Sequence, residues 1–296
     1  MARKINLSQI KSKINQAKNK QKAAIRKFEN EVNRAVNNFN QGVRRHNQKV
    51  RQHNTNVRAN RQKLINALNT FKSRTYRPTA TIQYSVELNQ SAQTLNRSYE
   101  RLESGIVQRH DGFDHRLLLD LPEQENTNSL MLYNSLAGND EEDDQSVQDL
   151  GRTAIEELIY QTSPEYCKRW QGAIFALNPD NPDAARHFCT SAREICIGLL
   201  DIHAPNEEVL VFNNNDLTED GRPTRRSKIK YLLHRKSILD INFESFVEED
   251  MKNVLQLFHV LNGATHGSAG KFGVPQLLKL KKRVEDSIVF INSIAV

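Results

Sequence analysis

Residues 36–71 read VNNFNQGVRRHNQKVRQHNTNVRANRQKLINALNTF, and an apolar residue recurs at every seventh position of this stretch. The repeated residues are Val36, Val43, Val50, Val57, Leu64 and Phe71. A second row, three positions later, is mostly polar and consists of Phe39, His46, His53, Asn60 and Ala67. A seven-residue spacing is typical of a helix that packs along a coiled-coil seam. The stretch therefore predicts a coiled-coil helix with one apolar and one more polar edge.

The predicted helix extends from Leu7 to Phe71, because this range contains no proline and only one glycine, Gly42. At 1.5 Å per residue, such a helix is about 100 Å long. Arg77–Pro78 ends it, since proline lacks a backbone donor and restricts the residue before it. A second amphipathic stretch, Leu88–Ile106, follows. Two arrangements are open: a single long helix, or a helical hairpin.

The net charge of +7 is divided unevenly along the 296 residues. Residues 1–80 hold 20 Lys and Arg but only Glu29 and Glu31 as acids, a balance of +18, whereas residues 81–296 carry a balance of −11. Such asymmetry is typical of a basic arm with an anionic partner. The arm is either a stalk with a solvated basic face or a surface that contacts phosphates through Arg44, Arg45, Lys49, Arg51, Arg58, Arg61 and Lys63. A steep salt dependence of binding would distinguish the second case.

Several classes of protein are excluded by composition. No apolar run approaches the roughly 18–20 residues of a membrane helix, and the N-terminal MARKINLSQI lacks the apolar core of a secretory signal. Cys167, Cys189 and Cys196 are too few for a disulfide framework, and Cys189 and Cys196, seven residues apart, are expected in the core. We therefore expect a cytoplasmic protein.

The rest of the chain predicts a second domain that is also helical. Residues 1–110 form the arm, residues 111–146 a loop and an acidic linker that contains GNDEEDD, and residues 147–296 a compact domain. The fold class is thus all-α, with the arm followed by a helical bundle. Predicted helices in the bundle cover 147–160, 163–177, 184–203, 243–265 and 274–295, with Asn181 as a possible cap of the third.

A second basic cluster lies inside the acidic half. Seven of the fifteen residues 222–236 are basic and none is acidic: Arg222, Arg225, Arg226, Lys228, Lys230, Arg235 and Lys236. Thr224 suits the start of a helix there. The cluster is either a solvated helix face or a phosphate-binding surface.

A glycine-rich segment, NGATHGSAGKFG at 262–273, separates the last two predicted helices. It is not a P-loop, because Thr265 and Phe272 occupy the positions of its first glycine and its Ser/Thr. His266 lies where a helix ends, so it is either a structural histidine or an acid/base in RNA cleavage. Lys271 is a candidate phosphate ligand. No spacing predicts a metal site, since Asp180 and Asp183 lie in a turn and Glu248–Asp250 are adjacent.

Three segments together carry a resemblance to a known family: DAARHFCTSAREICIGLLDIHAP at 183–205, DGRPTRRSKIKYLL at 220–233 and LNGATHGSAGKF at 261–272. They resemble the predicted nuclease domains encoded beside prokaryotic PIWI-like proteins, which look like divergent relatives of the HEPN superfamily of helical ribonucleases. The resemblance covers roughly residues 150–296. It implies a HEPN-like bundle, frequent dimerisation, RNA cleavage without a metal or other cofactor, and a role in bacterial defence or toxin systems.

The resemblance also implies roles for individual residues. HEPN ribonucleases generally use Arg-x4–6-His, and His266 is the matching histidine, although Leu261 stands five residues before it. Arg193, or Arg225 and Arg226, would then supply the guanidinium, with Glu194 as the orienting residue. Arg109 and His115 fit Arg-x5-His but lie outside the resembling region.

The sequence therefore predicts an antiviral-defence or toxin-type effector that is a metal-independent RNA endonuclease, a hydrolase. Its expected partners are nucleic acid, RNA rather than DNA, a second copy or a higher oligomer formed through the coiled coil, and a defence-system protein. The alternative is a non-enzymatic coiled-coil adaptor or structural subunit of a defence complex. Catalytic candidates are His266, Arg193 and Glu194, and the phosphate-binding candidates are Arg225, Arg226, Lys228, Lys271, Arg44, Arg45, Arg51 and Arg58.

Overall fold

The computed structural model describes residues 7–74, 83–107, 116–137, 147–151, 153–178, 180–263 and 272–296. These ranges are helical and contain no strand, apart from one isolated bridge between Leu217 and Pro223. The all-α prediction is confirmed. The chain divides into two compact units, Met1–Arg58 and Ala59–Val296. Among the described residues, no helix is long and apolar enough to cross a membrane.

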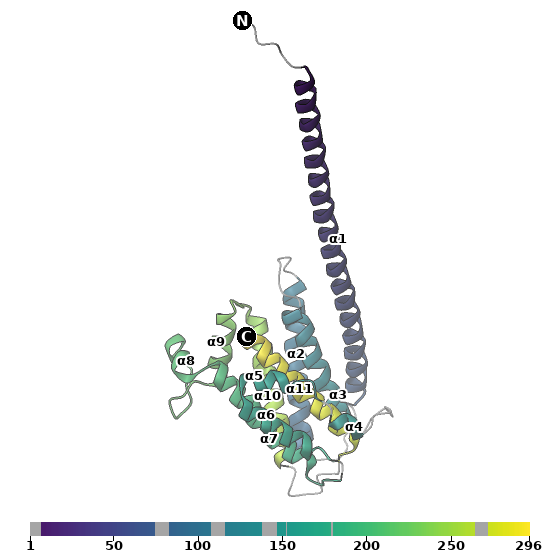
Figure 1. Ribbon diagram of the computed structural model, residues 1–296. Helices are drawn as coiled ribbons and strands as arrows, with labels where there is room; N and C mark the ends of the chain where they lie inside the picture. The colour runs from purple at the N-terminus through teal and green to yellow at the C-terminus, as the bar shows by residue number, and fades with distance from the viewer. Residues whose placement is uncertain are drawn as a thin grey trace. The chain divides into compact units, whose positions relative to one another are not determined.

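Helix α1 (Leu7–Arg74) confirms the predicted long N-terminal helix (Figure 1). In the first unit most of its described side chains are exposed, including the apolar ones of Val36, Phe39 and Val43. In the second unit the same seven-residue pattern is buried, because Leu64, Ala67 and Phe71 belong to the core. Phe71 packs edge-on against Tyr133, with ring centroids 5.2 Å apart.

The second unit is a bundle around α10 (Ile241–Gly263) and α11 (Val274–Ala295), seen in Figure 1. Helix α2 (Gln83–Val107) packs most extensively against α10 and also contacts α3 (Leu121–Leu136). Helix α2 is therefore part of the bundle, which belongs to the unit Ala59–Val296.

Residues 116–137 are helical, so the loop and linker predicted across 111–146 do not hold for this part. A π-helical turn (Arg116–Asp120) leads into α3, which packs against α11. The buried side of α3 carries mostly polar side chains, among them Glu125, Asn126 and Ser129. Apolar periodicity is therefore a weak signal for this helix.

The remaining helices are α4 (Val147–Leu150), α5 (Glu156–Thr162), α6 (Pro164–Ala176), α7 (Ala184–His203), α8 (Asn206–Phe212) and α9 (Arg225–Arg235). Helices α7 and α11 have the predicted bounds, whereas the single helix predicted over 147–160 is two short helices. Asp183, not Asn181, is the residue that precedes α7; the Asn181 side chain instead accepts a hydrogen bond from the backbone N–H of Asp183 at 3.0 Å. Helices α6 and α7 pack together, and Trp170 meets Phe188 edge-on at 5.7 Å.

Candidate nucleic-acid interface and charge clusters

The principal catalytic candidate, His266, lies outside the described residues, as do Lys271, Arg109 and His115. The helices on either side of the glycine-rich segment are described, with α10 ending at Gly263 and α11 beginning at Val274. The start of α11 is anchored by Gln276, whose side chain accepts from the Gly273 N–H at 2.9 Å and donates to the Ser135 carbonyl at 3.1 Å. The chain thus leaves the glycine-rich segment at a fixed point on the bundle.

Arg193 and Glu194 are both exposed on α7. Glu194 forms an ion pair with Arg169 of α6, and Arg169 also pairs with Glu165 at 2.8 Å. The carboxylate of Glu194 therefore pairs with a side chain of the neighbouring helix and links α6 to α7. Arg193 is accessible to an external anion.

Helix α9 begins as predicted, because the Thr224 hydroxyl accepts a hydrogen bond from the backbone N–H of Ser227 at 3.2 Å. Several basic side chains of this helix are paired with carboxylates of neighbouring helices. Arg226 lies 3.4 Å from Glu248, Lys228 2.5 Å from Asp201 and Lys230 3.4 Å from Glu244. Lys228 is buried as well. Much of the cluster therefore holds α9 on the bundle.

Arg235 is also hydrogen-bonded to neighbouring helices. Its guanidinium donates to the carbonyl oxygens of His203, at 3.3 Å, and of Ala295, the last residues of α7 and α11. Such carbonyls lack partners within their own helices, so the arginine satisfies them. Arg222 and Arg225 are exposed and have no ion pair within the described part of the chain. They are the members of the cluster best placed to meet a phosphate.

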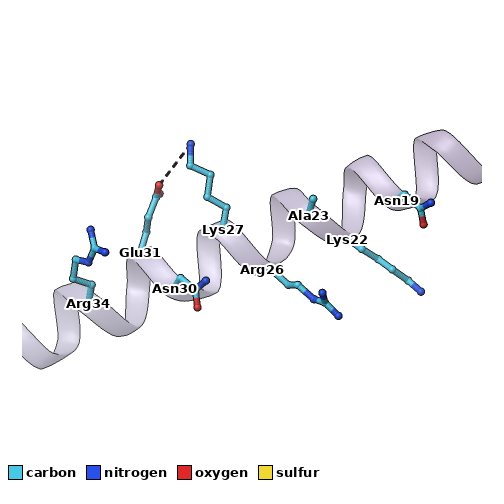
Figure 2. Close-up of a pocket in the computed structure, with 8 residues that line it drawn as sticks. All are labelled: Asn19, Lys22, Ala23, Arg26, Lys27, Asn30, Glu31 and Arg34. Atoms are coloured by element: carbon cyan, nitrogen blue, oxygen red, sulfur yellow. Dashed lines mark ion pairs between the residues drawn. The ribbon is translucent and has the colours of Figure 1, made fainter.

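The basic side chains in the first unit of α1 differ from those of α9 in their exposure and their ion pairs. Arg44, Arg45, Arg51 and Arg58 are exposed, and none has an ion pair with a described residue. The acids of this unit are Glu29 and Glu31, and the latter lies 4.0 Å from Lys27. Figure 2 shows that pair in a shallow hollow lined by one helix alone, with Lys22 and Arg26 extending from the other side. The helix therefore offers an open basic surface rather than an enclosed site.

A buried charge network, not expected from the sequence, joins α3, α10 and α11. Arg283 is fully buried, and its guanidinium donates to Glu125, to Asp250 at 2.6 Å and to Asn253 at 3.1 Å. Ser287 donates to the same carboxylate of Glu125 at 2.8 Å. The signal that could have found it is a set of polar residues at helical spacing, Arg283 with Ser287 and Asp250 with Asn253, on helix faces that are otherwise apolar.

Burial governs the protonation of this network. It raises the pKa of Glu125 well above its ordinary range, an effect increased by Asp250 and opposed by Arg283. Burial likewise raises the pKa of Asp250, against the effect of Arg283. One guanidinium faces two carboxyl groups, and a buried cluster is most stable without net charge, so we expect the pair to share one proton. Because the residues are inaccessible, the network positions the helices that flank His266 rather than meeting a substrate.

A second acidic group of unusual protonation is Glu123 on α3. It is buried, and burial raises its pKa to about 7, with Arg61 opposing the rise and Glu103 adding to it. The Arg61 guanidinium lies 4.0 Å from Glu123 and 2.7 Å from Glu103. Burial also raises the pKa of Tyr99, whose hydroxyl is hydrogen-bonded to Glu123. Because its pKa is raised, Glu123 makes the stability of the fold depend on pH between its ordinary pKa and about 7.

The cysteines lie in the core, as predicted for Cys189 and Cys196. Cys167, Cys189 and Cys196 are free and buried, and burial raises the pKa of the Cys189 and Cys196 thiols. A thiol in such surroundings is a poor nucleophile. Among the described residues, no group of three or more His, Cys, Asp or Glu is arranged to hold a metal ion.

Part of the chain matches a known family. Residues 160–291 match the family model described as predicted pPIWI-associating nuclease. The resemblance inferred from the sequence is confirmed for this segment. It extends from α5 to α11 and so includes α9, the glycine-rich segment and Arg283. No curated protein and no solved structure matches the chain.

Proposed function

We propose that this chain is an RNA endonuclease of a bacterial defence or toxin system that cleaves without a metal and acts with a PIWI-like protein. The observation that carries the proposal is the match of residues 160–291 to a predicted pPIWI-associating nuclease family. His266 is the proposed acid/base, and Arg193 and Arg225 are the proposed phosphate ligands. Their exposure supports this assignment for the two arginines.

In the proposed reaction His266 removes the proton from a ribose 2′-hydroxyl, whose oxygen attacks the adjacent phosphorus. The bond from phosphorus to the 5′-oxygen breaks, and that oxygen takes a proton. The products are a 2′,3′-cyclic phosphate and a 5′-hydroxyl. Arginine side chains bind the phosphate because their fork of N–H donors matches two of its oxygens.

The test is cleavage of labelled RNA in EDTA by the full chain, alone and together with its PIWI-like partner. His266→Ala should abolish cleavage. The matched control is His259→Ala, since His259 is an exposed histidine seven residues earlier, on α10. Absence of cleavage by the wild-type chain in every combination, or equal activity of the two variants, would overturn the proposal.

The proposed role of the arm is to bind the RNA backbone and to form oligomers. Arg44, Arg45, Arg51 and Arg58 of α1 support backbone binding, because they are exposed and have no ion pair with a described residue. The absence of aromatic residues between Asn40 and Ala59 disfavours stacking on bases. Deletion of residues 1–74 removes Leu64, Ala67 and Phe71 from the core. Charge substitutions within residues 1–58 are therefore the sharper test.

A second candidate is a non-enzymatic adaptor whose bundle binds a defence protein and whose arm recruits nucleic acid. The ion pairs of Glu194 with Arg169 and of Lys228 with Asp201 favour it, because these predicted site residues already have partners within the bundle. An adaptor would tolerate His266→Ala but would fail when the arm loses its charge.

A further inference from the structure

The apolar seam of α1 in the first unit carries large apolar side chains that are exposed. Val32, Val36, Phe39, Val43 and Val50 are between 41% and 71% exposed. They continue the seven-residue register that is buried at Leu64, Ala67 and Phe71 in the second unit. A row of large exposed apolar side chains on a helix marks an interaction surface.

The residues beside this seam are almost entirely uncharged. In coiled-coil terms Val36, Val43 and Val50 occupy position a, and the flanking position e is Asn33, Asn40, Asn47 and Asn54. The other flanking position, g, is Ala35, Gly42, Lys49 and Asn56. In a parallel pair each g residue faces the e residue of the partner five positions later. Lys49 would then face Asn54, and no like charges would meet.

The basic residues lie away from the seam. Six basic residues occur between Val32 and Arg58, and five of them occupy the outer positions b, c and f: Arg34, Arg44, Arg45, Arg51 and Arg58. Two copies of this helix can therefore pair despite their charge, because the charges stay in solvent on the outer faces. An unpaired helix that bound RNA would not need its basic residues to be separated from its apolar seam.

The residues within the seam also favour one orientation and one register of two paired helices. Valine at position a favours two-stranded parallel coiled coils. The alternate position d contains Val32, Phe39, His46 and His53. In a parallel pair, valine meets valine and imidazole meets imidazole, whereas an antiparallel pair places imidazoles against valines. The polar pairs thus penalise other registers, as a buried asparagine does in many coiled coils.

We propose that residues 32–57 of α1 pair with the same residues of a second copy of this chain as a parallel, in-register coiled coil, with the basic residues on its outer faces. This proposal deepens the arm's proposed role. It rests on the proposed function only where it assigns RNA binding to the basic residues on the outer faces. Each dimer presents two basic faces, so it contacts phosphates on both sides of the coil.

The first test measures the mass of the full-length protein in solution by light scattering. The wild type should have the mass of two chains. Val36→Lys, Val43→Lys and Val50→Lys, combined, should give the mass of one chain, because six lysines would meet in the seam. The matched control, Gln41→Lys, Gln48→Lys and Thr55→Lys, adds the same charge at the same spacing on the outer face and should remain dimeric. A monomeric wild type, a trimer, or a dimer that survives the seam lysines would overturn the proposal.

The second test addresses orientation by disulfide cross-linking. With Val43→Cys, a parallel in-register pair brings the two introduced thiols together, and oxidation should link the chains. Gln41→Cys on the outer face should not cross-link, and the native cysteines are buried. Absence of a link at position 43 in a dimeric protein would exclude this orientation. RNA binding is a separate readout, since charge removal at Arg44, Arg45, Arg51 and Arg58 should weaken it and leave the dimer intact.

Discussion

Arg283 of the second unit and four arginines of the first unit have opposite surroundings. In the first unit Arg44, Arg45, Arg51 and Arg58 extend into solvent from α1 without ion pairs among the described residues. In the second unit Arg283 is fully buried and contacts Glu125 and Asp250. The number of basic residues in a unit therefore does not indicate whether they bind an external anion or hold helices together. Exposed arginines remain available for an external anion, whereas the buried one determines how helices pack.

The largest expected effect comes from Arg283→Met. It removes the only guanidinium shown to contact Glu125 and Asp250 in the described network, and it leaves two buried carboxyl groups without a counter-charge. We expect the free energy of unfolding to fall by about 3–5 kcal/mol, measured by urea denaturation. Lys282→Met is the matched control, because Lys282 is exposed and pairs with Asp286 at 2.6 Å; its cost should be at most about 1 kcal/mol. Equal losses for both variants would remove the contrast between buried and exposed charge.

A somewhat smaller effect concerns Glu123, whose pKa in the fold is raised to about 7 from an ordinary value near 4.5. Stability from this group is fully present below pH 4.5 and is lost as pH rises to about 7. The loss amounts to roughly 3 kcal/mol at most.

Glu123→Gln should flatten this part of the pH dependence of unfolding. Glu100→Gln, at an exposed residue of α2, should leave it unchanged. A wild-type stability that is constant between pH 4.5 and 7 would contradict the assignment.

An intermediate case is the basic helix α9, which is held by its cap as well as by ion pairs. Thr224→Ala removes the hydroxyl that accepts from Ser227 and should lower the free energy of unfolding by about 1 kcal/mol. Thr224→Ser keeps the acceptor and should cost less. Thermal unfolding followed by circular dichroism measures both, and indistinguishable midpoints would show that the cap is not used.

The smallest effect on stability is expected in the arm. Replacing Arg44, Arg45, Arg51 and Arg58 together by glutamine should change the free energy of unfolding by less than about 0.5 kcal/mol per site, because each side chain is exposed. The same variant should lower the slope of log affinity for single-stranded RNA against log salt by about 3. Filter binding at several salt concentrations measures the slope. An unchanged slope would place the RNA contact elsewhere.

Much of the fold follows from local pattern. The seven-residue repeat predicts α1, the proline-free apolar stretches predict α7 and α11 with the bounds observed, and Thr224 is recognisable as a cap. The full extent of α3 does not follow from local pattern, because its buried face carries Glu125, Asn126 and Ser129, which local rules assign to the surface. The candidate site stays a prediction: Arg225 is exposed, Glu194 has a partner on α6, and His266 lies outside the described residues.

The sequence by itself determined the long helix and the uncharged flanks of its seam, which depend on neighbours a few residues apart. It also determined the division of the net charge into +18 over residues 1–80 and −11 over residues 81–296. The tertiary structure decided which charges are paired. Arg283 meets Glu125 across 158 residues of chain, and Lys228 meets Asp201 across 27. Periodicity cannot specify such contacts, because they depend on how whole helices pack, and burial then turns an ordinary carboxyl into one with a raised pKa.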